Sequence, residues 1–147
     1  MKFEEFTPGR VIDAGAAPVT EAALIEFARQ WDPQLFHIDR TAAERSRWQG
    51  LIASGWHTCA IAMRLAVDNV LRGSNASASP GIDELRWHAP VRAGDVLRLT
   101  LHVLESRVSS SGQCGVVRWR WEVHTQAQTK VLTLLATSLF DLVEPAT

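Results

Sequence analysis

The 147-residue sequence has little cysteine, no surplus of one charge and no long apolar run. Its two cysteines, Cys59 and Cys114, lack metal-type spacing with other ligands and are expected to stay reduced. A formal net charge of −1 leaves no basic excess to hold a phosphate backbone, so nucleic acid is a poor candidate partner. No segment reaches the ~18 apolar residues that a membrane span needs, and the first residues form no apolar export segment. We expect a soluble, cytoplasmic protein.

The chain is long enough and apolar enough for one domain of ordinary size. Hydrophobic residues make up 46% of the sequence, which is enough to bury a substantial core. The sequence contains no internal repeat and no heptad pattern. We therefore expect a single domain that spans residues 1–147.

The first half of the chain carries helical patterns. Thr20 can cap a helix over Glu21–Trp31, in which apolar residues recur at helical spacing, and a proline then ends it. Residues 32–39 are predicted to form a loop. A short polar helix is expected over residues 41–47, with Asp39 as its cap.

A longer helix is predicted to be almost entirely buried. Residues 49–63 contain no charged side chain, and Arg64, Asp68 and Arg72 then fall on one stripe. A helix that is apolar around most of its circumference has to be wrapped by other structure, and a curved sheet is the simplest wrapping. The polar residues 73–80 that follow are expected to form a flexible linker.

The second half of the chain carries strand patterns. Apolar and polar residues alternate in three segments, and a fourth segment is more uniformly apolar. Turn signals at residues 92–95 and 109–112 separate consecutive runs and favour antiparallel pairing. With a weaker strand over residues 10–16, the predicted fold class is α+β, a long helix wrapped by an antiparallel sheet. The four later strands are expected at residues 84–89, 97–103 and 117–123 and from Val131 to Val143.

Residues 32–57 hold the pattern with the most chemical content. Asp32 and His37 lie five residues apart in the predicted loop, and Gly55 opens the buried helix. A carboxylate and an imidazole can share a water molecule, with one group accepting a proton while the other donates. A glycine at a helix N-terminus lets a carbonyl approach the free N–H groups, which would stabilise an enolate oxygen. This combination points to a hydratase or dehydratase.

Each of these residues also has a purely structural interpretation. An Asp before a Pro commonly ends a helix, and a lone histidine between Phe36 and Ile38 is more often packed than catalytic. Gly55 by itself says little. Two titratable groups in one short loop, followed by a helix that a glycine opens, favour the functional interpretation.

Other polar residues are first interpreted as structural. His57 is expected to bond to nearby backbone rather than to face a substrate pocket or a partner. His88, His102 and Glu122 are expected on the solvated faces of strands.

Potential metal ligands and a group of tryptophans in this region also have simpler interpretations. His37, Asp39 and His57 offer three potential ligands, but structural zinc sites usually carry four compact ligands and often include Cys. We therefore expect no metal site. Buried aromatic residues are more often core than tunnel lining, so core positions are expected for three tryptophans. These are Trp31, Trp48 and Trp56.

The residues around Asp32 and His37 resemble a known family. The hydratase motif of the MaoC-like and (R)-specific enoyl-CoA hydratase family is similar to two segments, Phe27-Ala-Arg-Gln-Trp-Asp32-Pro-Gln-Leu-Phe-His37-Ile-Asp39 and Leu51-Ile-Ala-Ser-Gly-Trp56. The strand and turn that follow the helix in that family resemble Trp87-His-Ala-Pro-Val-Arg-Ala-Gly-Asp-Val-Leu97. The resemblance covers most of the chain, and the Asp-to-His spacing is its most specific element.

The resemblance implies a fold, a substrate and a reaction. It implies the hotdog fold, a homodimer whose two sheets join edge to edge, and an acyl-CoA thioester as substrate. Asp32 and His37 would activate water for reversible hydration of a trans-2-enoyl thioester to its (R)-3-hydroxy form, and Gly55 N–H would hold the thioester oxygen. No metal or redox cofactor is implied. The residues expected to complete the oxyanion and substrate-binding site are Ser54, Trp56 and Gln34.

The sequence departs from the family's usual pattern at four positions. Gln34 and Leu35 stand where the motif has Asn and Pro. Ser54 stands where a His often precedes the glycine, and Met63 replaces a Ser that some members carry on the inner helix. These changes leave the acid/base pair intact and bear on substrate choice and catalytic efficiency.

Two alternative functions remain at the level of sequence. A non-catalytic acyl-thioester binding protein would keep the loop without the geometry for turnover. A hotdog thioesterase commonly uses an Asp or Glu on or near the central helix, whereas the first carboxylate after Gly55 is Asp68, about four turns later. The thioesterase is therefore the weaker enzyme hypothesis.

Overall fold

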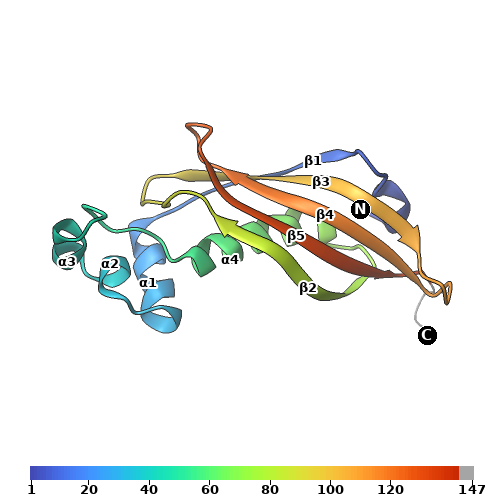
Figure 1. Ribbon diagram of the computed structural model, residues 1–147, viewed down its shortest axis with the longest axis horizontal. Coiled ribbons are helices and arrows are strands. Elements are labelled where there is room, and N and C mark those ends of the chain that lie inside the picture. The colour runs from blue at the N-terminus through green and yellow to red at the C-terminus, as the bar shows by residue number, and fades with distance from the viewer. Residues whose placement is uncertain (143–147) are drawn as a thin grey trace.

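A computed structural model, which describes residues 1–142, consists of one antiparallel sheet packed on a long helix (Figure 1). The strand order β1-β3-β4-β5-β2 leaves β1 and β2 at the two edges. Three short helices gather at one end of the molecule, beside the start of the long helix (Figure 1). The elements in chain order are η1 (Phe3–Glu5), β1 (Val11–Pro18), α1 (Glu21–Trp31), α2 (Leu35–Ile38), α3 (Arg40–Arg45), α4 (Gly55–Ala66), η2 (Val67–Leu71), β2 (Ala76–Trp87), β3 (Val96–Val108), β4 (Cys114–His124) and β5 (Lys130–Asp141).

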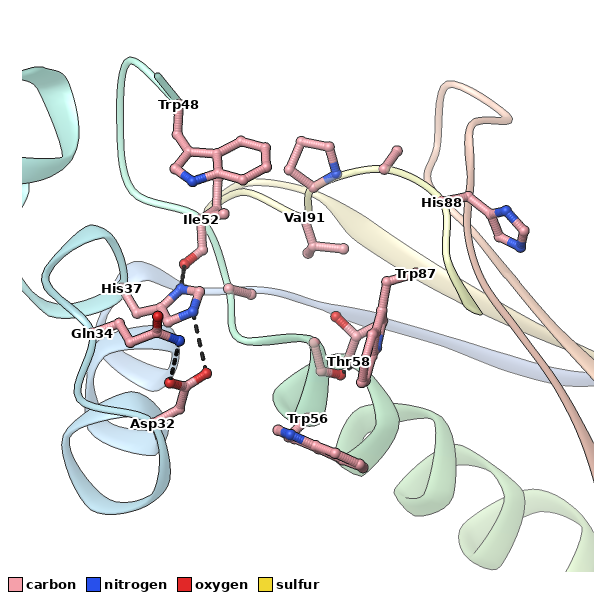
Figure 2. A pocket seen from close by; sticks show the side chains of 14 residues that line it. Asp32, Gln34, His37, Trp48, Ile52, Trp56, Thr58, Trp87, His88 and Val91 are labelled. Carbon is pink, nitrogen blue, oxygen red and sulfur yellow. Dashed lines mark hydrogen bonds and ion pairs between the residues drawn. The ribbon is translucent and has the colours of Figure 1, made fainter. Parts of the chain in front are cut away.

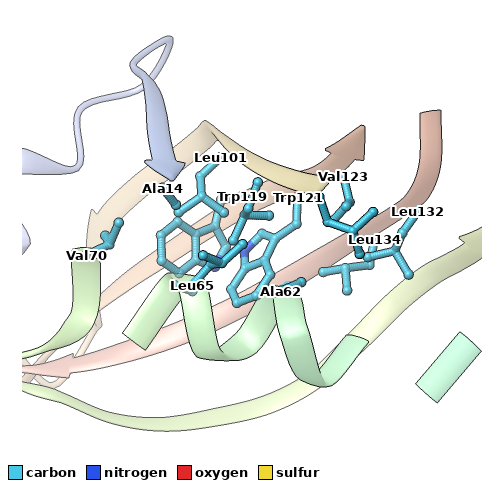
Figure 3. Close-up of a cluster of buried hydrophobic side chains, with 14 of the residues drawn as sticks. Ala14, Ala62, Leu65, Val70, Leu101, Trp119, Trp121, Val123, Leu132 and Leu134 are labelled. Carbon is cyan, nitrogen blue, oxygen red and sulfur yellow. The ribbon is translucent and has the colours of Figure 1, made fainter. Parts of the chain in front are cut away.

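The core lies between α4 and the inner face of the sheet (Figure 3). Trp119 and Trp121 of β4 are buried there and meet edge to face, with ring centroids 5.6 Å apart. The helix presents Ala62, Leu65 and Ala66 to this cluster. Its small alanines leave room for the two indoles, so a bulky strand and a slim helix face complement each other. This packing confirms the predicted α+β class.

The predicted helices in the first half of the chain are present, with small differences in their boundaries. Thr20 caps α1 by accepting a hydrogen bond from Ala23 N–H at 3.2 Å. Asp39 caps α3 by accepting from Ala42 N–H at 2.8 Å. The predicted loop is not wholly irregular, because residues 35–38 form the single helical turn α2.

The predicted linker at residues 73–80 is wrong, because β2 begins inside it at Ala76. The strand pairs antiparallel with β5 over its whole length, with three register shifts. Its serines bond across to the neighbouring strand, as where Ser79 Oγ donates to Thr137 O at 2.7 Å. Pro80 is tolerated because β2 is an edge strand. Polar, small residues therefore form strand here because a partner supplies the hydrogen bonds.

The expected near-complete burial of α4 is also wrong. One stripe of the helix faces outward and includes Trp56 and Met63, which are 58% and 47% exposed. Trp87 at the end of β2 is 45% exposed, so the alternation over residues 84–89 does not produce a half-buried strand. The absence of charge identified a helix that packs on a sheet but not the stripe that the sheet leaves uncovered.

The remaining strand predictions are confirmed. β3 and β4 alternate between buried and partly exposed residues, and β1 lies where the weak strand was expected. Turns close at the predicted places, with Asp95 N–H donating to Arg92 O and Gly112 N–H to Ser109 O. The last strand ends at Asp141, and Val143 lies outside the described residues. Within residues 1–142, no helix combines the length and apolar character needed to cross a membrane.

Candidate active site

Asp32 and His37 face each other (Figure 2), at the end of the molecule where α1, α2 and α3 gather (Figure 1). Asp32 is the C-cap of α1, and His37 lies in the α2 turn. The His37 Nε2 atom lies 3.2 Å from Asp32 Oδ2. The imidazole is buried, while the carboxylate side chain keeps 18% of its surface exposed. The two residues that the sequence placed in one segment therefore form a contacting pair that solvent can reach.

The orientation of the His37 ring is fixed by a backbone carbonyl. His37 Nδ1 lies 2.7 Å from Ile52 O, and Phe36 packs edge-on against the ring at 4.4 Å. A carbonyl can only accept, so Nδ1 carries the hydrogen that this bond needs. Nε2, the nitrogen that faces Asp32, is then the ring position that can gain or release a proton. The structure thus holds a group able to exchange a proton beside a carboxylate.

Three neighbouring groups contact the Asp32 carboxylate. Ser54 Oγ donates to Oδ2 at 2.7 Å, Gln34 Nε2 donates to Oδ1 at 2.8 Å, and His37 approaches Oδ2. Burial alone opposes the charge and would raise the pKa of Asp32. The hydrogen bonds from Ser54 and Gln34, together with the nearby imidazole, outweigh this effect and hold the pKa below its ordinary value. Asp32 is therefore ionised at neutral pH.

Ser54 and Gln34 serve first to hold this carboxylate. Ser54 is completely buried and is the N-cap of α4, where its Oγ also accepts from Trp56 N–H at 3.3 Å. One side chain therefore links the start of α4 to the Asp32 carboxylate. Gln34 is exposed and directs its amide at the same carboxylate. Direct contact of these residues with a substrate stays a prediction.

A pocket of about 460 Å³ opens beside the pair. Gly55 lies in its wall, and the Gly55 N–H is the first of α4, so it has no acceptor within the helix. The pocket thus contains a proton acceptor, a carboxylate and the positive end of a 12-residue helix. Residues in its wall include Asp32, His37, Trp48, Trp56, Trp87 and Val91.

Trp87 is a site residue that the sequence did not indicate. Its Nε1 donates to Gly55 O at 2.9 Å, and its ring packs closely against the glycine. A Cβ atom added to Gly55 would fall 2.5–2.8 Å from three atoms of the indole, closer than real contacts allow. Gly55 is therefore required by the packing of Trp87, in addition to any approach of a substrate. Their separation of 32 positions along the chain explains why no sequence pattern showed the contact.

His57 contradicts the expectation that it bonds to nearby backbone. The side chain is buried and stacks on Phe27 of α1, with ring centroids 4.8 Å apart and planes inclined by 11°. Its Nδ1 has no hydrogen-bond partner within residues 1–142. Burial lowers the pKa of His57, so the ring is neutral and acts as an aromatic contact between α1 and α4.

The expectations for the three tryptophans have mixed outcomes. The core placement is wrong for Trp31 and Trp56, which are 68% and 58% exposed, whereas Trp48 is partly buried. Trp48 and Trp56 both line the pocket. Among the described residues, no three His, Cys, Asp or Glu side chains converge as metal ligands. Asp39 instead caps a helix.

His88 and the two cysteines lie in the environments predicted for them, whereas Glu122 does not. His88 is exposed, as expected, and its Nε2 lies 2.7 Å from Thr133 Oγ1. Glu122 is not freely solvated, because its side chain is only 15% exposed and pairs with Arg120 at 2.9 Å and with His102 at 3.7 Å. Both cysteines are free thiols, as expected.

Comparison with known proteins identifies the family. The family model of the MaoC-like domain matches residues 3–125, which is most of the chain. The chain belongs to the MaoC-like dehydratase family. This MaoC-like protein therefore has the hotdog fold that its sequence resemblance implied.

Solved structures agree with this membership. The MaoC-like dehydratase from Rhodospirillum rubrum is 34% identical, with a TM-score of 0.85 and 97% coverage of both chains. A monoamine oxidase regulatory protein from Archaeoglobus is 27% identical, with a TM-score of 0.86 over 97% of this chain and 95% of that one. The R-hydratase PhaJ1 from Pseudomonas aeruginosa is 25% identical, with a TM-score of 0.78 over 99% of this MaoC-like chain and 91% of its own.

Proposed function

We propose that this MaoC-like protein is a hydro-lyase that reversibly hydrates a trans-2-enoyl-CoA to an (R)-3-hydroxyacyl-CoA. The supporting observation is the contacting pair of His37 and Asp32, in which His37 Nε2 is directed at the carboxylate beside the first turn of α4. The names of two structural relatives, a dehydratase and an R-hydratase, support the reaction class.

The pair supplies both halves of a proton transfer. Ionised Asp32 accepts one hydrogen of a bound water and orients its oxygen toward C3 of the enoyl group. His37 Nε2 takes the other proton as the oxygen bonds to C3 and the C2–C3 double bond shifts toward the carbonyl. The imidazolium then returns that proton to C2, so one water is added and both residues regain their starting charge. Dehydration follows the same steps in reverse.

Gly55 supports the negative charge that develops on the thioester oxygen. Its N–H is the first donor of α4, while the next N–H, that of Trp56, is taken by Ser54. A preorganised donor at a helix N-terminus stabilises an enolate more than a neutral carbonyl, and removal of one such donor typically costs ~10²–10³ in rate. Gly55 N–H is therefore assigned to the oxyanion.

The test is the loss of enoyl-thioester absorbance when purified protein is mixed with crotonyl-CoA. Asp32→Asn and His37→Ala should each lower kcat/KM by ~10²–10⁴, because each removes a positioned proton-transfer group. Asp13→Asn and His102→Ala are matched controls, since Asp13 pairs with Arg98 and His102 with Glu122 on the sheet, away from the pocket. Equal rates in the pocket variants and the controls would refute the assignment.

The same reaction mixture distinguishes the alternatives. A thioesterase would release free CoA thiol, whereas hydration consumes the enoyl absorbance without thiol release. Asp68 is poorly placed as its base, because it lies on the exposed stripe and is paired with Arg64 and Arg72. Tight binding of crotonyl-CoA with no loss of absorbance would instead favour a binding protein.

A second copy of the chain is the partner that we propose for β2. This 12-residue strand pairs on one side with β5, and eleven of its residues are exposed. A long free edge is a template for pairing with another strand, and Ile82 there leaves 56% of its surface uncovered. Edge-to-edge pairing of two β2 strands would join two sheets. Sedimentation equilibrium at twice the monomer mass would support the dimer, and a monomer mass would exclude it.

A further inference from the structure

Two cavities adjoin along α4, and Trp87 stands where they meet. The catalytic pocket includes Gly55, Trp56 and Trp87 in its wall. One turn further along α4, Cys59 lines a second cavity of about 630 Å³, which lies between α4 and strands β2, β4 and β5. Cys59 comes four residues after Gly55, so the two residues lie on the same face of α4, one turn apart. Trp87, which packs against Gly55 and lines the first cavity, therefore stands beside the residue that begins the second.

The second cavity, here called the apolar groove, offers almost only hydrocarbon and sulfur surface. The side chains that define it include Cys59, Met63, Ile82, Trp121, Leu134 and Ala136. Its floor belongs to the buried core, since Trp121 and Leu134 are only 6% and 4% exposed. Such a lining binds an apolar chain and has little to offer a polar or charged group.

The Trp87 ring is held firmly in its position. Its Nε1 donates to Gly55 O, its ring leaves no room for a Cβ atom on the glycine, and Trp56 meets it edge to face with centroids 5.2 Å apart. It extends from the last residue of β2 to the first turn of α4 (Figure 2). A ring fixed at both ends is a wall rather than a mobile side chain.

We propose that Trp87 is a specificity-determining residue, which separates the catalytic pocket from the apolar groove and limits the substrate to a short acyl group. The proposal rests on the hydratase function. An enoyl thioester bound with its carbonyl at Gly55 and C3 at His37 has its acyl tail beside α4, where the Trp87 ring stops it. Without that ring the tail would continue past Cys59 into the groove.

The experiment compares kcat/KM for trans-2-enoyl-CoA substrates of four, six and eight carbons. Wild-type protein should prefer the four-carbon substrate. Trp87→Ala should raise the ratio of eight-carbon to four-carbon kcat/KM by at least about tenfold, since each methylene buried in an apolar site contributes about fourfold. The ratio cancels any general loss of activity that follows from removing the contact with Gly55.

Trp87→Phe is the matched control. It keeps an aromatic wall but loses the Nε1 bond to Gly55 O, so kcat should fall for every chain length while the ratio stays near that of wild type. Trp31→Ala, which removes an exposed tryptophan outside both cavities, should leave the ratio unchanged. Adding Met63→Trp to Trp87→Ala should fill the groove and reverse the gain.

Titration calorimetry with butyryl-CoA and octanoyl-CoA gives a readout that does not depend on turnover. Trp87→Ala should tighten the binding of octanoyl-CoA relative to that of butyryl-CoA. If the alanine variant does not fold, Trp87→Leu is measured in its place. A wild-type enzyme that uses the eight-carbon substrate as well as the four-carbon one would overturn the proposal. An unchanged ratio in both Trp87→Ala and Trp87→Leu would overturn it too. Absence of hydration at every chain length would overturn the hydratase function instead, and the binding ratio would still test the wall.

Discussion

The contact between Gly55 and Trp87 makes Gly55→Ala an informative single substitution. The added methyl group would lie 2.5 Å from Cε2, 2.6 Å from Nε1 and 2.8 Å from Cδ2 of the indole. Neither partner can yield easily, because the ring is bonded to Gly55 O and packed on Trp56. Overpacking of this kind typically costs ~1–3 kcal/mol of unfolding free energy. Alanine favours a helix over glycine by at most about 1 kcal/mol, so the substitution should destabilise the protein.

Gly55→Ala should also reduce catalysis. If the first turn of α4 moves to relieve the clash, the Gly55 N–H leaves its position in the pocket wall, and loss of one oxyanion donor costs ~10²–10³ in kcat. Urea unfolding and the crotonyl-CoA assay measure the two effects. Gly81→Ala is the control, because a Cβ there meets no atom within 4 Å and Gly81 does not have a positive φ.

A double-mutant cycle tests whether the indole is the cause. Gly55→Ala should cost much less stability in a Trp87→Ala background than in wild type, which gives a coupling free energy of ~1 kcal/mol or more. Equal costs in both backgrounds, or a Gly55→Ala protein as stable as Gly81→Ala, would refute the reasoning from the clash.

Two further predictions concern the neighbours of the site. Ser54→Ala and Thr20→Ala each remove a helix cap, and each should lower the free energy of unfolding in urea by ~0.5–2 kcal/mol. Only Ser54→Ala also removes a hydrogen bond to the Asp32 carboxylate. It alone should raise the pKa of Asp32 and move the acidic limb of the pH–rate profile to higher pH. An unmoved limb would contradict the role given to Ser54. Burial lowers the pKa of His57 below the ordinary ~6.5, so between these two pKa values the unfolded chain binds more protons than the folded one. As the pH falls below ~6.5, the free energy of unfolding should therefore decrease by up to ~1.4 kcal/mol per pH unit, until the lowered pKa is passed. His57→Phe should flatten this dependence in unfolding measurements from pH 5 to 8, whereas His88→Gln should not, and a flat wild-type profile would contradict the effect.

Much of the fold followed from local patterns in the sequence. The caps at Thr20 and Asp39, and the alternation along β3 and β4, act between residues that are neighbours on one helix turn or one strand face. Such signals depend on backbone preferences and on which side of an element is apolar. The element order and the α+β class therefore needed no knowledge of the chain's path.

The main errors arose where a distant segment decides the outcome. β2 forms from small polar residues because β5 supplies its hydrogen bonds, and Trp56 stays exposed because the sheet covers only part of α4. His57 lacks the expected backbone bond because Phe27, thirty residues earlier, offers it an aromatic face instead. No local pattern contains this information.

The candidate site likewise combines residues that are close in sequence with contacts from distant segments. The candidate pair could be predicted from the chain alone, because a five-residue spacing keeps Asp32 and His37 within reach of each other, and so could the glycine at the head of α4. Ile52 O, which fixes the imidazole, and Trp87, which lines the pocket, come from segments that only folding brings to the pair. Spacing along a chain limits which groups can meet, but the direction of a ring nitrogen and the lining of a pocket depend on contacts between distant residues.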